Sequence, residues 1–290
     1  MKIKGHPHEP FALGRNMRER VVIKWGGGLI TEKSSLCTPD LEILEQLAQT
    51  IVDCQKNGID VILVHGAGSF GHLRAKHWRL NEGSLPNAQF SRDEKCRTQR
   101  EAVETVRQEM FELNAHVCHA LEQKNLTPVI HPPHRWAQNT GPTFSGSLHR
   151  FDEQNEGQVH VTFGDVVDVE GDAEFGILSG DDLVVRLAVE LRAVQRLVFA
   201  IKGVDGILRV PPEQADDSDL IENWYPAIEF EGTHQSQIDV TGGIGLKAAR
   251  GALVASHGIE VTMVNGAKTD RVLNAMLGNP VRGTRVSDKQ

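Results

Sequence analysis

HGAGSFGH, residues 65 to 72, stands at the end of a nearly continuous apolar run, IDVILVH at 59 to 65. Such a run is typical of a strand whose two faces are both covered by helices. A glycine-rich turn at the carboxyl end of a parallel strand lets the backbone approach a bound group closely. The stretch therefore predicts an α/β protein, and it raises the question of which phosphate the turn holds.

Two phosphate-binding motifs fit this turn only in part. Read from Gly66, it matches G-x-G-x-x-G and also the first six positions of G-x-x-x-x-G-K-[ST]. A dinucleotide site needs a following strand that ends in an acidic residue, but residues 73 to 92 contain no apolar run. The second motif needs Lys and a hydroxyl residue where this chain has His72 and Leu73. The turn is therefore of another kind.

Strands and helices alternate along the whole chain. Short apolar runs predict strands at 21–25, 59–65, 127–131, 159–163, 196–201 and 259–265. Helices are predicted after Asp40 until Gly58, over 92–124, from Ser179 through Leu191, over 245–258 and over 271–277. NTGPTFSGS, residues 139 to 147, is predicted as a loop or hairpin. The alternation indicates one domain over residues 1–290, an α/β three-layer αβα sandwich with a mostly parallel central sheet, preceded by a flexible extension at 1–19.

Composition excludes several classes of function. The chain has 290 residues, a formal net charge of -8 and a pI of about 5.9, so no basic surface for nucleic acid is expected. No segment reaches the roughly 18 apolar residues that span a bilayer, and no membrane association is expected. The four cysteines form no C-x-x-C pair, which favours a reduced, cytoplasmic protein. The runs HVCH (116–119) and HPPH (131–134) lack two further zinc ligands at suitable spacing, so no protein-held metal is predicted.

Three glycine-rich turns each follow a strand or open a helix, at 26–28, 66–71 and 241–245. Backbone N–H groups in such turns point at a ligand, and a helix N-terminus adds favourable partial charge for an anion. Each turn also travels with a basic side chain, namely Lys24, His72 or Lys247. The three glycine turns, each accompanied by a basic side chain, together favour a phosphate-binding site more strongly than a single turn does.

The chain resembles the amino acid kinase superfamily, and within it the isopentenyl phosphate kinases. Six stretches carry this resemblance, in this order and at their separations: VVIKWGGGLITEKSS, HGAGSFGH, FGDVVDV, ILSGDDLV, KGVDGIL and DVTGGIGLKAA. The resemblance covers roughly residues 20 to 287. The histidine that ends the second glycine turn is the discriminating element, although fosfomycin kinases share a Phe-Gly-His ending. Trp25 and Gly28 depart from the residues usual in the family.

The resemblance also implies roles for individual residues in phosphoryl transfer. Lys24 and Lys247 would contact the transferred group, His72 would hold the acceptor phosphate, and Asp165 would orient the lysines through charge pairing. Asp165 also has a plainer interpretation, as an aspartate in a turn at a strand end. The residues implied for ATP binding are Lys24, Gly26, Gly27, Lys33, Gly68, Ser179, Asp181, Asp205, Gly243 and Lys247; those implied for the acceptor are Ala67, Gly68, His72 and Gly164.

The function so implied is ATP-dependent phosphorylation of isopentenyl phosphate, with dimethylallyl phosphate as a second acceptor and Mg²⁺ as the cofactor. An N-terminal lobe over about 20–175 would bind the acceptor and a C-terminal lobe over about 176–290 would bind ATP. Relatives are dimers, which implies a homodimer. Two alternatives stay open: a kinase for another small phosphate or a phosphonate such as fosfomycin, and a non-catalytic ligand sensor with the same fold.

Overall fold

The computed structural model describes residues 17–32, 35–230 and 243–289. Within these ranges, eight strands form one sheet in the order β3-β4-β2-β1-β7-β9-β10-β8. Neighbouring strands run parallel except β9 and β10, which are antiparallel. The strands are β1 (Arg20–Trp25), β2 (Asp60–His65), β3 (Thr127–Ile130), β4 (Gln158–Phe163), β7 (Val194–Ile201), β8 (Asn223–Trp224), β9 (Glu260–Asn265) and β10 (Thr284–Val286). The mostly parallel sheet predicted from the sequence is confirmed.

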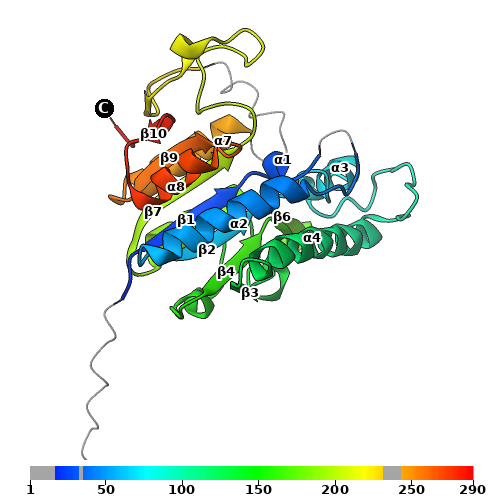
Figure 1. The fold of residues 1–290 in the computed structure, drawn as a ribbon. Coiled ribbons are helices and arrows are strands. Elements are labelled where there is room, and N and C mark those ends of the chain that lie inside the picture. The colour runs from blue at the N-terminus through cyan, green and yellow to red at the C-terminus, as the bar shows by residue number, and fades with distance from the viewer. Residues whose placement is uncertain (1–16, 33–34, 231–242, 290) are drawn as a thin grey trace, which may run out of the picture.

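Helices cover both faces of the sheet, so the three-layer prediction is also confirmed. The helices α2 (Leu41–Lys56), α4 (Gln99–Glu122) and α8 (Thr269–Leu277) lie side by side on one face (Figure 1). On the other face, α5 (Gly180–Glu190) packs against α7 (Ile244–Ala255). β1 shows how alternation along a strand builds both cores. Val21, Ile23 and Trp25 belong to the core under α2, α4 and α8, and Val22 belongs to the core under α5 and α7. All four side chains have no exposed surface.

The predicted helix starts are capped by the side chains that the sequence indicates. The Asp40 carboxylate accepts a hydrogen bond from the Ile43 amide at 3.1 Å, and the Ser179 hydroxyl accepts one from the Asp182 amide at 3.1 Å. Each bond satisfies an amide that has no partner inside its helix. The start of α5 is thereby fixed beside the end of β1, against which α5 packs.

The helix predicted over 92–124 begins later, after Thr98. The preceding residues are held in a turn, because the Asp93 carboxylate accepts hydrogen bonds from the amides of Lys95 and Cys96 at 2.8 and 2.7 Å. A side chain that binds backbone amides two and three residues ahead competes with helix formation.

Several short elements are not among those predicted from the sequence. β5 (Asp165–Asp168) and β6 (Phe175–Leu178) form an antiparallel hairpin. α1 (Gly27–Ile30) begins within the first glycine turn, and α3 (His72–His77) follows the second. Residues 139–147 are irregular apart from a bridge between Gln138 and Ser145. Short 3-10 helices lie at Leu80–Glu82, Pro133–Arg135, His149–Phe151, Gly171–Ala173 and Asp217–Asp219. Among the described helices, none has the length and apolar character needed to cross a bilayer.

Candidate active site

The turns after β1 and β2 pack directly against each other at the carboxyl ends of these neighbouring strands. A Cβ atom added to Gly27 would lie 2.2 Å from the amide nitrogen of Gly68. Gly68 has a φ of +55°, and its own added Cβ would lie 2.4 Å from the carbonyl oxygen of Gly27. No side chain fits at either position, so the first two glycine turns meet backbone to backbone.

The first turn of α5 delivers a carboxylate to the same end of the sheet. Asp181 is fully buried and forms ion pairs with both Lys24 and Lys247. The distance from Lys247 Nζ to Asp181 Oδ2 is 3.3 Å. We call these three residues the Asp181 cluster. Its members come from β1, α5 and α7, so segments far apart in the sequence meet in one buried charge centre.

The electrostatics of Lys24 depend on this cluster. Burial lowers the pKa of Lys24 from its ordinary value of 10.5 to about 8. The negative charge of Asp181 opposes that effect and raises the pKa, whereas the positive charge of Lys247 lowers it. Lys24 therefore keeps its charge at pH 7 beside a carboxylate that supports it, although its side chain is only 5% exposed.

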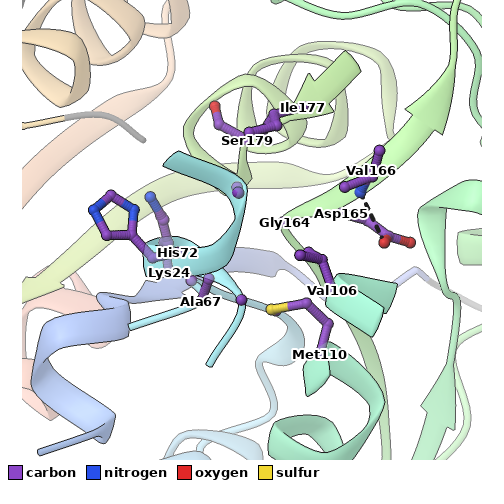
Figure 2. Close-up of a pocket in the computed structure, with 14 residues that line it drawn as sticks. Lys24, Ala67, His72, Val106, Met110, Gly164, Asp165, Val166, Ile177 and Ser179 are labelled. Carbon is purple, nitrogen blue, oxygen red and sulfur yellow. Dashed lines mark hydrogen bonds between the residues drawn. The ribbon is translucent and has the colours of Figure 1, made fainter. Parts of the chain in front are cut away.

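Asp165 does not form the predicted charge pairs with the lysines. Its Oδ2 accepts hydrogen bonds from the backbone amide and the ring Nδ1 of His134 at 3.0 and 2.7 Å, and its Oδ1 accepts one from the Val166 amide at 2.8 Å. Figure 2 shows this carboxylate directed away from Lys24. The pairing with both lysines is made instead by Asp181, which the sequence reasoning placed among the ATP-binding residues.

A second ion pair lies next to the Asp181 cluster. Asp182 Oδ1 accepts a hydrogen bond from Arg250 Nε at 2.7 Å, and its Oδ2 accepts one from the Ser179 hydroxyl at 2.7 Å. Sequence reasoning missed Arg250. The sequence does indicate this residue, because Arg250 follows Lys247 by three positions, and side chains three positions apart lie on the same face of a helix.

Lys24, a member of the Asp181 cluster, lines a cavity whose side chains are drawn in Figure 2. Its polar lining side chains are Lys24, His72, Asp165 and Ser179, and its apolar ones are Ala75, Val106, Met110, Val166 and Ile177. The second glycine turn contributes Gly66, Ala67 and Gly71, and two further glycines, Gly164 and Gly180, complete the lining. Gly180 leaves room for the lysine, since an added Cβ would lie 3.1 Å from Lys24 Cε. The cavity thus combines basic side chains, close backbone approach and a hydrocarbon wall.

The structure brings most of the predicted acceptor residues together. Ala67, His72 and Gly164 line the cavity, and Gly68 lies in the adjoining turn. Lys24, predicted to contact the transferred group, lines the same cavity. Lys247 reaches the same centre through Asp181, with which Lys24 also pairs. The three basic side chains that accompany the glycine turns are therefore gathered in one region of the molecule.

Other predicted nucleotide residues lie beside this region or outside the described residues. Gly26 precedes α1 and donates its amide to the Ala200 carbonyl at 2.9 Å, and Gly243 precedes α7. Asp205 does not line the cavity. It accepts a hydrogen bond from Arg282 Nε at 2.7 Å and forms an ion pair with Arg271 at 2.6 Å. Lys33 lies outside the described residues.

The arrangement is suited to binding anions that carry an apolar group. Within the described part of the chain, no three His, Cys, Asp or Glu side chains gather as a metal site requires. Fixed ammonium groups and backbone amides beside the cavity can stabilise negative charge on phosphoryl oxygens without reorganising.

Comparisons with known proteins show the family of this chain. The model of the amino acid kinase family matches residues 19–265. The isopentenyl phosphate kinase of Methanothermobacter thermautotrophicus is 30% identical over 280 residues, which cover 93% of this chain and 99% of that kinase. The isopentenyl phosphate kinase of Thermoplasma acidophilum is 28% identical over 255 residues, or 87% of this chain and 94% of that kinase. A solved isopentenyl phosphate kinase structure superposes with a TM-score of 0.74 at 26% identity, covering 93% of this chain and 100% of the other. This chain therefore belongs to the amino acid kinase family, whose members are ATP-using phosphotransferases.

Proposed function

We propose that this chain transfers the γ-phosphoryl group of ATP directly to isopentenyl phosphate, forming isopentenyl diphosphate and ADP. The observation that carries the proposal is the composition of the cavity lining. Lys24 and His72 supply cationic or hydrogen-bonding groups, while Val106, Met110 and Ile177 supply an apolar wall. A monophosphate with a short hydrocarbon tail matches both parts.

The roles in this reaction follow from position. Lys24 and Lys247 would neutralise the charge that spreads over the transferred group, and Asp181 would hold both ammonium groups in place. The amides of Gly27 and Gly68 would add donors at the same point, whereas the Gly26 amide already binds the Ala200 carbonyl. With these groups fixed before binding, alignment of the two phosphates is the main catalytic task.

His72 would bind the acceptor phosphate. An imidazole N–H donates a hydrogen bond to a phosphate oxygen, and the bond is stronger when the ring is protonated beside a dianion. This reaction needs no general base, because the attacking oxygen of a phosphate monoester is already ionised at pH 7. Ala67 and Gly164, which line the same cavity, would complete the acceptor site with backbone contacts.

We place the acceptor in the lobe over about 20–175 and ATP in the lobe over about 176–290. The cavity lining supports this division, since its residues lie between 24 and 166 except for Ile177, Ser179 and Gly180. Ser179, Asp181, Asp205, Gly243 and Lys33 are the remaining nucleotide-binding candidates. Mg²⁺ bound to the phosphate oxygens of ATP would neutralise charge during transfer. The carboxylates of Asp181 and Asp182 already pair with cationic side chains. Binding of Mg²⁺ through the ATP phosphates, and not through these carboxylates, is consistent with that pairing.

The substrate proposal is supported by the names of the relatives and is tested by a substrate screen. Purified protein is incubated with ATP, Mg²⁺ and one of isopentenyl phosphate, dimethylallyl phosphate or fosfomycin, and ADP release is followed together with product mass. We expect the highest kcat/KM for isopentenyl phosphate. Preferred turnover of fosfomycin would assign the chain to phosphonate kinases, and binding without ADP release beyond background would make it a sensor.

We further propose that the protein is a homodimer in the cytoplasm. The four cysteines are free and lie buried or half-buried, as suits a reducing compartment. Light scattering of the purified full chain measures the oligomeric state, and a monomeric mass at assay concentration would overturn the dimer.

A further inference from the structure

Glu109 places a buried carboxylate in the middle of α4, on the face that packs toward the second glycine turn. Its exposure is 3%, and it lies one helical turn after Val106 and beside Met110, both of which line the cavity. A carboxylate is seldom buried in a helix stripe of this kind unless it is fully paired.

Among the described residues, each hydrogen-bond partner of this carboxylate is a donor. Oε2 accepts the backbone amide of Gly71 at 3.1 Å. Oε1 accepts Arg74 Nε at 3.1 Å and Arg74 Nη2 at 2.9 Å, and Lys95 Nζ lies 3.4 Å away. Glu109 therefore ties together the end of the glycine turn, the helix α3 and the segment that precedes α4.

The bond to Gly71 acts on the residue immediately before His72. Gly71 has a φ of +68°, and its amide is the last donor of the turn before α3 begins. Arg74, two residues beyond His72, is bound by Glu109 on one side and by Asp93 on the other. His72 is thus flanked in sequence by two residues that Glu109 anchors.

We propose that Glu109 is a positioning residue for the acceptor site, which sets the direction of the His72 ring by anchoring Gly71 and Arg74. The inference rests on the role proposed for His72 in binding the acceptor phosphate. Glu109 on α4 would contact neither substrate, but it would fix the position of His72, which contacts the acceptor.

The chemistry of the site makes the matched substitution Glu109→Gln informative. A glutamine side chain has nearly the same shape but offers one acceptor oxygen and one N–H₂ donor. Because the site presents only donors, the amide must face either Gly71 or Arg74 with its own N–H₂ group. The anchor is then lost on one side while the packing volume is preserved.

A double-mutant cycle with His72→Ala tests whether Glu109 acts through His72. In the otherwise native protein, we expect Glu109→Gln to lower kcat/KM for isopentenyl phosphate at least tenfold, with the KM for ATP changed less than twofold. In a His72→Ala protein, the same change should cost less than twofold. Equal losses in both backgrounds, or a loss below twofold in the native background, would overturn the inference.

A second readout does not depend on turnover. The imidazole carbon-bound proton of His72 is assigned in the NMR spectrum by its disappearance in His72→Ala. We expect Glu109→Gln to move this signal and Glu112→Gln, an exposed glutamate on the same helix, to leave it in place. An unmoved His72 signal in Glu109→Gln contradicts the positioning role even if isopentenyl phosphate proves not to be the substrate.

Glu109→Asp serves as the second variant should Glu109→Gln fail to fold. It keeps the charge but withdraws the carboxylate by one methylene, so one of the two anchors is lost. The His72 signal should again move, and a signal at the native position would overturn the proposal.

Discussion

Replacing Asp181 by Asn tests the electrostatic centre of the site. The substitution keeps the size of the side chain but removes the negative charge that lies between Lys24 and Lys247. Removing one partner of a buried ion pair costs roughly 3–5 kcal/mol, because the remaining charge is left uncompensated. Lys247 is 14% exposed and can turn toward water, so we expect the lower end, a loss of about 3 kcal/mol in unfolding free energy at pH 7.

The same substitution should change the pH dependence of activity. The pKa of Lys24 is about 8 with Asp181 present, and it falls further when the charge that raises it is removed. Above the pKa, each further pH unit lowers the protonated fraction about tenfold. The alkaline limb of kcat/KM for ATP, which reports groups of the free enzyme, should therefore move to lower pH, with at least a roughly tenfold loss at pH 8.

The control is Asp165→Asn, because the sequence hypothesis gave the lysine-orienting role to Asp165. Its carboxylate binds His134 instead, so the alkaline limb should stay where it is in the native protein. Activity is measured from pH 6 to 9.5 by coupled ADP release, and stability by urea unfolding. An Asp181→Asn protein with an unmoved alkaline limb and kcat/KM within twofold of the native value would refute the account of the Asp181 cluster.

Three further outcomes are expected. The pKa of Lys24 is lowered from 10.5 to about 8, so between pH 8 and 10.5 the unfolded chain binds more protons than the folded one. The unfolding free energy should therefore rise by about 3 kcal/mol over that pH range. Lys24→Met should lack this rise when unfolding by urea is measured at each pH. Gly68→Ala should lower the unfolding free energy by at least roughly 3 kcal/mol, since the new Cβ meets the backbone of Gly27, whereas Gly58→Ala, also at positive φ but in open space, should cost roughly 1–2 kcal/mol in the same assay. Met110→Ala should enlarge the apolar part of the cavity, so kcat/KM for a prenyl phosphate one carbon longer should rise about fourfold relative to isopentenyl phosphate, and an unchanged ratio would remove Met110 from the acceptor site.

The long apolar strands and the capped helices were predictable because their signals are local. A short run that opens with three β-branched residues, such as Val21 to Trp25, and a capping residue such as Asp40 specify their own conformation within a few positions. The β5–β6 hairpin lacked such a signal, since its strands are four residues each and their pairing depends on the turn between them.

The composition of the site was predictable from the glycine turns and their cations, but the pairing of charges was not. Asp165 and Asp181 both follow strands and both stand near glycines in the sequence. Only the packing of α5 against β1 decides which carboxylate reaches Lys24. Glu109 was missed for a related reason. The helix was predicted from the spacing of its apolar residues alone, and the partners of the buried Glu109 carboxylate lie on other segments of the chain.

The central claim is that Lys24, His72 and Lys247 gather around a direct transfer between two phosphates, and labelled ATP tests it most directly. ATP carrying ³²P in its γ-phosphate is mixed with isopentenyl phosphate and Mg²⁺, and the label in isopentenyl diphosphate is counted against ADP formed. We expect one labelled product per ADP, and at least a hundredfold lower kcat/KM for isopentenyl phosphate in a folded His72→Ala protein whose ATP affinity stays within twofold. Label released only as inorganic phosphate, or a His72→Ala protein with native kcat/KM, would contradict the account.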